Sequence, residues 1–180
     1  MMKPKFLRIL LALTVIAIAG AAQQTPAEYP SIQNFLRLNE QVCTGGQPSM
    51  EDLAKLKAEG VKAIINLRQA SEYNFEEEAA KAKELGLRYF YIPVNAADPR
   101  DEQVEEFLKV TADPENHPAF IHCRTANRVG AFWMIRRVLV DRWKIEDAEA
   151  EGKKIGLHRE NLIEFARNYI ERHRKTNERS

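Results

Sequence analysis

The sequence predicts an α/β fold, a three-layer sandwich in which a mainly parallel central sheet is flanked by helices. Short apolar, β-branched segments alternate along the chain with longer segments of helical periodicity, and this alternation is typical of parallel sheets. A run of helical segments then closes the chain. With 180 residues, the chain is long enough to bury one core without disulfides or a structural metal.

Four segments are predicted as strands, because apolar residues are concentrated in them and turn residues bound them. The first is short, stops at the Gly45-Gly46 turn, and is expected at the edge of the sheet. The second follows Gly60 and is rich in β-branched apolar residues, which favours a central position. The predicted strands are, in order, 42–43, 61–67, 87–94 and the segment that ends at Cys123.

Six helices are predicted from periodic apolar residues and from the residues at their ends. Ser49 is a suitable N-cap for the first helix, with Asp52 three residues on, and Asp101 is expected to cap the third. The second helix is rich in charge and alanine, and its run Glu76–Glu78 is predicted to be a solvated face. The predicted helices are 49–60, 71–85, 101–112, 128–143, 145–155 and 157–174.

The beginning of the chain is predicted to be a targeting signal. Three basic residues, Lys3, Lys5 and Arg8, precede an apolar run, and Ala19-Gly20-Ala21 supplies small residues for cleavage. The mature protein is therefore expected to be exported, to a periplasm or out of the cell. The alternative is an uncleaved anchor over residues 7–22, the one case in which membrane contact is expected. The predicted organisation is a signal peptide over 1–21, a linker over 22–30, a domain over 31–175 and a polar tail over 176–180.

The charge balance argues against a nucleic-acid partner. The chain has 27 lysines and arginines against 26 aspartates and glutamates, a formal net charge of +1. Three of these basic residues and no acidic residue lie in the predicted signal peptide, so the remainder is slightly acidic. Such a balance leaves no basic footprint for nucleic acid. No group of histidines and cysteines has the spacing of metal ligands, so no metal and no other cofactor is expected.

The two cysteines, Cys43 and Cys123, allow a structural disulfide in an exported chain. We favour a free, reactive Cys123, because the residues that follow it all suit anion binding and a buried disulfide does not need them. Cys43 is then a small buried residue, with a regulatory bridge to Cys123 as the alternative.

The segment 120–130 carries the expected chemistry. An apolar strand ends in the thiol of Cys123, a short polar loop follows, and a helical pattern begins at Arg128. Loop N–H groups and the positive end of the helix dipole favour a thiolate and an anionic ligand at this point. The Arg128 guanidinium can hold two oxygens of a phosphate or of a sulfur-bearing oxyanion. The residues expected around the anion are Arg124, Thr125, Ala126, Asn127, Arg128 and Val129.

Three further residues are candidates for a supporting role. His122 is expected to order the loop by hydrogen bonding, or to be only a hydrogen-bonded histidine at the end of a strand. Gln47 and Arg68 end elements that are expected to point toward the same cleft, because ligands bind at the carboxyl ends of parallel strands. Arg68 can instead pair with Glu72 on the surface, and Arg124 either adds positive potential at the rim or is only solvated.

His122-Cys123 followed by Arg128-Val129-Gly130 resembles the signature of cysteine-dependent phosphatases. Two upstream motifs sharpen the resemblance: Gly46-Gln47-Pro48-Ser49 with Asp52-Leu53, and Ile64-Ile65-Asn66-Leu67-Arg68. They are similar to motifs of bacterial phosphatases related to the β-lactamase-hydrolase-like phosphatases and to phosphatase domains fused to NAD-kinase-like proteins. The resemblance covers residues 35–170. It implies a dual-specificity-phosphatase-like fold and hydrolysis of phosphotyrosine or another phosphomonoester, with a phosphorylated protein or a small molecule as partner.

The resemblance also implies a mechanism. The Cys123 thiolate attacks phosphorus, Arg128 holds the transferring oxygens, a carboxylic acid protonates the leaving alcohol, and water then hydrolyses the phosphocysteine. Asp98 is the candidate acid, because Asp98-Pro99 resembles the acid-bearing loop of the family. Asp101 is its competitor, although a helix cap is the commoner role at such a position.

Three departures from the family pattern keep two other functions open. Four residues lie between Cys123 and Arg128, where the common tyrosine-phosphatase loop has five. Four also matches the loop of rhodanese-like sulfurtransferases, in which Cys123 would carry a persulfide. The family's loop glycine is Ala126 here, and its Ser/Thr after the arginine is Val129, whose missing hydroxyl implies slow turnover. A phosphate-binding or phosphopeptide-binding module is therefore the second alternative.

Overall fold

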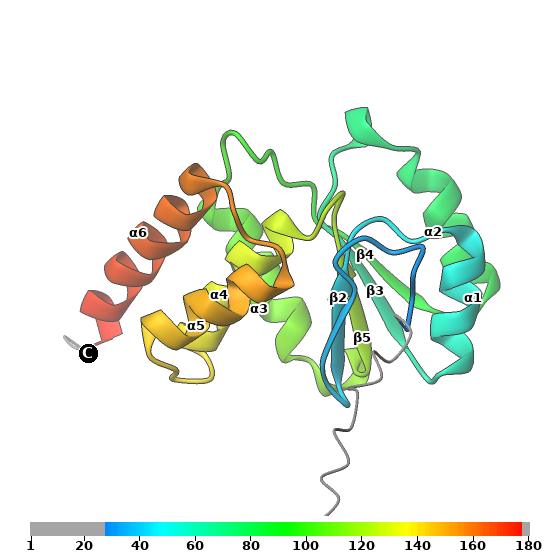
Figure 1. Cartoon of the computed structure of the whole chain (residues 1–180), viewed down its shortest axis with the longest axis horizontal. Coiled ribbons are helices and arrows are strands. Elements are labelled where there is room, and N and C mark those ends of the chain that lie inside the picture. Colours follow the sequence, from blue (N-terminus) through cyan, green and yellow to red (C-terminus); the bar gives the residue numbers. More distant parts are fainter. Residues whose placement is uncertain (1–27, 178–180) are drawn as a thin grey trace, which may run out of the picture.

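The computed structural model describes residues 28–177, and the predicted signal peptide lies outside this range. Its centre is a five-stranded sheet with the order β1-β2-β5-β3-β4. All neighbouring strands are parallel except β1, which is antiparallel to β2. The predicted mainly parallel sheet is thereby confirmed (Figure 1). The strands are β1 (Leu36–Asn39), β2 (Val42–Gly45), β3 (Ala63–Asn66), β4 (Arg88–Tyr91) and β5 (Ala119–His122).

Helices cover both faces of the sheet, so the predicted three-layer sandwich is also confirmed. Two helices lie on one face and four on the other, on the right and left of the sheet in Figure 1. Each face has its own cluster of buried apolar side chains. The first pair is α1 (Met50–Ala58) and α2 (Phe75–Glu84); the second group is α3 (Asp101–Ala112), α4 (Asn127–Leu139), α5 (Ile145–Ile155) and α6 (Glu160–Asn177).

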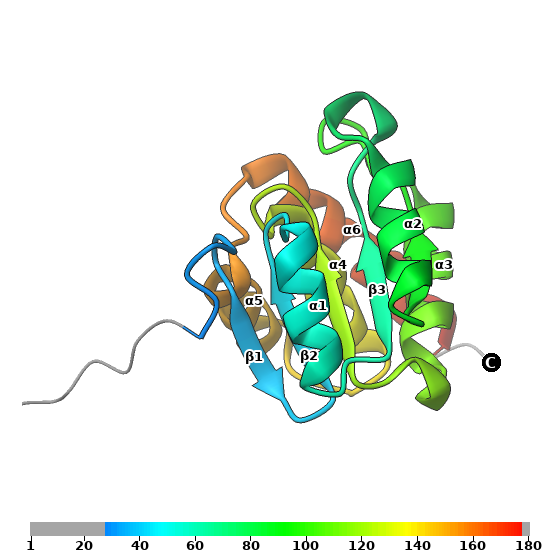
Figure 2. The same cartoon turned by 90° about the vertical axis from the view of Figure 1, so that its right-hand side faces the viewer.

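The prediction that the segment 42–43 forms the edge of the sheet is wrong. The strand at this edge of the sheet is β1, which lies outermost in Figure 2, and β2 pairs with both β1 and β5. Residues of β2 are buried throughout, whereas those of β1 alternate between half-buried and exposed. An antiparallel edge strand with one wet face is less apolar than an internal one, which is why its sequence gave a weaker signal.

The predicted helix 71–85 is two elements in the structure. The 3₁₀ turn η1 (Ala70–Glu72) comes first, and α2 starts after Asn74, whose side chain accepts a hydrogen bond from the Glu77 N–H. A similar turn, η2 (Pro114–Asn116), precedes β5. The break before Asn74 separates Glu72 from α2 and leaves it at the end of the sheet where the candidate site lies.

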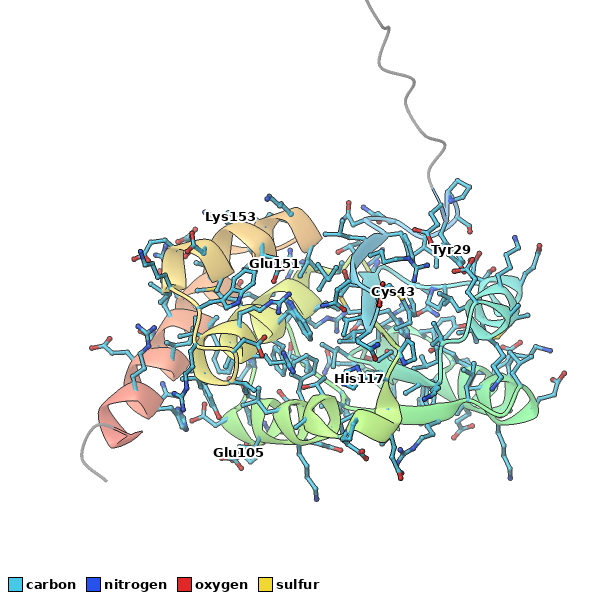
Figure 3. All side chains as sticks on the ribbon, turned by 90° about the horizontal axis from the view of Figure 1, so that it is seen from below. Tyr29, Cys43, Glu105, His117, Glu151 and Lys153 are labelled. Carbon is cyan, nitrogen blue, oxygen red and sulfur yellow. The ribbon has the colours of Figure 1, made fainter. Side chains whose placement is uncertain are left out.

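The two cysteines lie on opposite faces of the sheet. Cys43 packs with Tyr29 in the cluster beneath α1 and α2 (Figure 3), whereas Cys123 belongs to the cluster beneath α4. Cys43 is paired across the sheet with Phe120, so Cys123 is three residues farther along. At about 3.3 Å per residue the separation exceeds the roughly 7 Å limit for Cα atoms joined by a disulfide. Both cysteines are free, and neither disulfide alternative fits this fold.

Helices α4 and α5 approach each other closely at two glycines. A Cβ atom built on Gly130 would lie 2.6 Å from the Gly152 carbonyl oxygen and 2.8 Å from the Leu157 Cβ. Only glycine permits this spacing, because a backbone oxygen and a Cβ atom joined directly to the backbone cannot move aside as the end of a flexible side chain can.

Gly130→Ala is therefore expected to lower the free energy of unfolding by about 1–3 kcal/mol, the usual cost of overpacking. The clash must outweigh the gain of about 1 kcal/mol in helix propensity that alanine brings. Urea unfolding of both proteins measures the difference, and a variant with an equal or higher midpoint would contradict the packing argument.

Within residues 28–177, no helix is both long enough and apolar enough to cross a bilayer.

Candidate active site

The site lies at the carboxyl end of the parallel strands, as the sequence predicts. The loops that follow β3, β4 and β5 lie at the same end of the sheet, the upper end in Figure 1. They enclose a cavity of about 290 Å³. The residues that line it are Gln69, Glu72, Asn95, Ala96, Ala97, Cys123, Arg124, Thr125, Asn127, Arg128 and Arg159.

Cys123 follows the last residue of β5 and is 1% exposed. The loop after it, residues 124–126, is fixed from outside: the Arg124 carbonyl accepts from the Gln47 N–H at 3.3 Å, and the Thr125 carbonyl accepts from the Asn34 side chain at 3.1 Å. Because the N–H of a peptide unit points away from its carbonyl, the Thr125 N–H faces the opposite way from the Arg124 carbonyl.

The N–H groups of this loop form the anion cradle. In the described part of the chain, the N–H groups of Arg124, Thr125, Asn127, Arg128 and Val129 donate to no backbone carbonyl. Three of them are the first N–H groups of α4, which are left without partners at a helix N-terminus and carry its positive dipole end. Such an arrangement has the geometry and the charge to accept an anion next to the Cys123 sulfur.

Ala126 takes the left-handed conformation at φ 62°, which is strained for a residue with a Cβ atom. A non-glycine residue pays roughly 1–2 kcal/mol there. Its methyl group is fully buried. Asn127, which tolerates this conformation better, is instead the first residue of α4. The strain therefore falls on the residue that replaces the family's glycine.

Arg128 is held by a carboxylate that the sequence analysis did not assign to the site. Its Nη1 and Nη2 atoms donate to the two oxygens of Glu72 at 2.6 and 2.8 Å, and Nη1 also donates to the Val94 carbonyl at 2.9 Å. Burial alone would lower the pKa of Arg128, but the hydrogen bonds to Glu72 and the nearby Cys123 sulfur raise it. The guanidinium stays charged, and two parallel bonds fix its plane.

The Glu72 carboxylate is ionised in this position. Burial alone would raise its pKa, but the hydrogen bonds from Arg128 and from the Gln69 N–H hold the pKa below its usual value. Glu72 is therefore suited to orient Arg128 and not to donate a proton. The sequence places Glu72 four residues after Arg68, and this spacing predicts Arg68 as its partner instead of Arg128.

A second carboxylate, Glu78, lies buried beneath the loop. Its Oε1 atom is 2.7 Å from the His122 Nε2 atom, and both side chains are fully buried. Burial alone would raise the pKa of Glu78, but the charge and hydrogen bond of His122 lower it, as do hydrogen bonds from Gln47 and Tyr89. The role of His122 in ordering the loop stays a prediction, whereas the predicted solvated face is wrong for Glu78. The error arises because α2 turns Glu78 and Ala82, four residues apart, toward the sheet.

Gln47 and Arg68 connect the two carboxylates. The Gln47 side chain donates to Glu78 at 2.6 Å and accepts from Arg68 Nη1 at 2.8 Å, and Arg68 Nη2 donates to the Glu72 carbonyl at 2.6 Å. Arg68 does pair with Glu72, with 3.8 Å between Nε and Oε2, but Arg68 is 6% exposed, so the predicted surface location of the pair is wrong. One polar network thus runs from His122, before the nucleophile, to the Glu72 partner of Arg128.

The two acid candidates differ in their surroundings. Asp98 is exposed in the loop whose residues Asn95, Ala96 and Ala97 line the cavity, although its own side chain is not part of the lining. Asp101 accepts two hydrogen bonds of 2.8 Å from Arg172 on α6. The predicted cap at Asp101 is wrong, because Arg100 is the N-cap of α3. Asp101 is thus engaged away from the cavity.

Within residues 28–177, no three acidic, histidine or cysteine side chains are grouped so as to hold a metal ion.

Comparisons with known proteins agree with this geometry. Residues 24–176 match the model of a family described as DSP-PTPase phosphatase fused to NAD+ kinase. A β-lactamase hydrolase-like protein of Agrobacterium fabrum is 32% identical over 126 residues, which cover 67% of this chain and 29% of that protein. The chain therefore spans less than a third of this relative's length.

Two solved structures share the fold. The catalytic domain of the PP-IP phosphatase SIW14 from S. cerevisiae, in complex with citrate, has a TM-score of 0.65 and 20% identity, over 81% of this chain and 93% of that one. P. aeruginosa TpbA in complex with pTyr has a TM-score of 0.59 and 21% identity, over 80% and 91%.

Proposed function

This chain belongs to the DSP-PTPase phosphatases fused to NAD+ kinase, and we propose that it hydrolyses phosphomonoesters through a phosphocysteine on Cys123. The observation that carries the proposal is the buried Cys123 thiol, set among loop N–H groups without backbone partners and next to the guanidinium of Arg128. Phosphotyrosine is one substrate class that the proposal includes, since TpbA binds pTyr.

The hydrogen bonds of Arg128 determine how it would hold the phosphoryl group. A guanidinium has five N–H donors. Glu72 and the Val94 carbonyl use three of them, two on Nη1 and one on Nη2. The Nε–H and the second Nη2–H remain, and they lie side by side on one edge of the planar group. This edge can hold two phosphoryl oxygens while the loop N–H groups contact the third.

The reaction then has two steps. The Cys123 thiolate forms a bond to phosphorus as the bond to the leaving oxygen breaks, and a carboxylic acid gives that oxygen its proton. In the second step, water attacks the phosphocysteine, the S–P bond breaks, and the carboxylate takes the proton from the water. Inorganic phosphate leaves and the thiolate is restored.

We assign the acid to Asp98, whose loop forms one wall of the cavity. Asp98→Asn is expected to lower the rate on phenyl phosphate by about 10²-fold or more, because the poor leaving group needs a proton. The loss on 4-nitrophenyl phosphate should be several times smaller. Asp147→Asn, an exposed change in the first turn of α5, is the matched control. An unchanged rate on phenyl phosphate would exclude Asp98.

A sulfurtransferase is the second candidate, because four residues separate Cys123 from Arg128. The test measures phosphate release from 4-nitrophenyl phosphate and thiocyanate formation from thiosulfate and cyanide with the same purified protein. Phosphate release without thiocyanate supports the phosphatase, and the reverse result supports the sulfurtransferase. Phosphate binding without either turnover would support the binding module, with Ala126 and Val129 as its cause.

Export is part of the proposal. It rests on the basic, apolar and small-residue segments at the start of the sequence. Fractionation of cells that express the full chain should place a shortened protein beginning near Ala22 outside the cytoplasm. Full-length protein in the membrane fraction would favour the anchor over residues 7–22.

A further inference from the structure

The cavity is lined by cationic side chains other than the arginine that lies beside the nucleophile. Its charged lining consists of Arg124, Arg128, Arg159 and Glu72. Arg128 and Glu72 neutralise each other through two hydrogen bonds. Among the described residues, neither Arg124 nor Arg159 forms an ion pair with a carboxylate. Two cationic side chains therefore face the cavity beyond those that position the nucleophile.

Arg159 is attached to the phosphate-binding loop although it lies far away in the sequence. It is in the segment 156–159 between α5 and α6, and its N–H donates to the Asn127 side-chain oxygen at 3.4 Å. The His158 N–H donates to the same oxygen at 3.3 Å. Asn127 is the first residue of α4 and lines the cavity itself. Two hydrogen bonds from backbone N–H groups to the Asn127 side chain thus hold the Arg159 backbone next to the loop that contains Cys123.

Another wall of the cavity is tied to the start of α6, which follows this segment. The Asn161 side chain, at the start of α6, donates to the Ala96 carbonyl at 2.6 Å. Ala96 and Ala97 have small side chains, so this wall leaves room beside the nucleophile. The Arg159 side chain is exposed at the rim and has no hydrogen bond or ion pair of its own among the described residues.

We propose that Arg159, together with Arg124, forms a subsite for a second anionic group on the substrate, a phosphate or a carboxylate close to the scissile phosphate. The inference rests on the proposed phosphatase function. The free edge of Arg128 and the loop N–H groups already account for the scissile phosphoryl oxygens. Charged hydrogen bonds from Arg159 then discriminate between substrates with and without the second anion.

The test compares three aryl phosphates that share a ring: 3-carboxyphenyl phosphate, 1,3-phenylene bisphosphate and the uncharged 3-carbamoylphenyl phosphate. For the wild-type chain, kcat/KM for at least one of the two anionic esters should exceed that for the carbamoyl ester by about tenfold, the size of one charged hydrogen bond. The preference should fall to near one in Arg159→Gln and be largely kept in Arg159→Lys. Arg142→Gln, beyond the far end of α4, should keep the wild-type ratio.

Equal kcat/KM values for all three esters in the wild type would overturn the subsite and leave the phosphatase function standing. A preference that survives in Arg159→Gln would overturn the role of Arg159. If no ester is hydrolysed, the phosphatase function fails, and calorimetric binding of the same esters to Cys123→Ser decides the subsite. Tighter binding of an anionic ester that Arg159→Gln abolishes supports it, and equal affinities overturn it.

Discussion

Cys123→Ser is expected to lower phosphate release from 4-nitrophenyl phosphate by at least about 10⁴-fold, as removal of a catalytic nucleophile does in other hydrolases. A serine hydroxyl has nearly the same size as a thiol but does not ionise near neutral pH, so the loop has no anionic nucleophile to offer. Cys123 is almost fully buried and has a small side chain, so its replacement leaves little cavity and the fold is expected to persist.

Cys43→Ser is the matched control. Cys43 is buried on the opposite face of the sheet, and burial raises the pKa of its thiol to about 12, so it holds no reactive thiolate. This variant should keep kcat within about threefold of the wild-type value, with some loss of stability from the buried hydroxyl. The assignment of the nucleophile would be contradicted if a folded Cys43→Ser protein lost turnover and the Cys123→Ser protein kept it.

Glu78→Ala is expected to lower the free energy of unfolding by about 2–6 kcal/mol, because it leaves two buried polar side chains without their partner, at about 1–3 kcal/mol each. His122 would lose its contact at 2.7 Å, and Gln47 would lose a second one at 2.6 Å. Glu78→Gln keeps the shape and should lose less. Glu77→Gln, an exposed neutralisation one residue away, is the control and should change stability by under about 0.5 kcal/mol.

The same pair should make stability depend on pH. The pKa of Glu78 in the folded chain lies below the usual value of 4.5. Its contribution is therefore fully present above about pH 4.5 and is lost as the pH falls through the lowered folded value. Urea unfolding between pH 7 and pH 3 should show a steeper acid loss in the wild type than in Glu78→Gln. Parallel curves for the two proteins would contradict an ionised Glu78 carboxylate.

The nucleophile loop could be predicted from the sequence because its chemistry is local. Cys123 and Arg128 are close in the chain, and the strand before them and the helix after them are both strongly apolar. The alternation of strands and helices likewise predicts the layers and the parallel sheet. These features depend on neighbouring residues, which a single sequence displays directly.

The partners of these residues could not be predicted in the same way. Glu72 and Glu78 lie 56 and 44 residues from Arg128 and His122, and acidic residues on a charged helix are usually solvated. Their roles depend on which residues of a helix face the sheet. For Glu72 they also depend on the break before Asn74, which leaves Glu72 outside α2. Asp101 was predicted as a helix cap or as the acid, but it pairs with Arg172, which is 71 residues away and could not be identified as its partner from the sequence.

The contact between α4 and α5 has a consequence for substrate selection. Gly130 lies three residues after Asn127, and Leu157, which it contacts, lies two residues before Arg159. Gly130 and Gly152 have no Cβ atoms, so α4 and α5 can pack closely. This packing sets the distance between the Cys123 sulfur and the Arg159 subsite. Gly130 is not among the residues that line the cavity. Gly130→Ala is therefore expected to increase the separation of α4 from Leu157 and to alter which phosphate esters are preferred, with Cys123 and Arg128 unchanged.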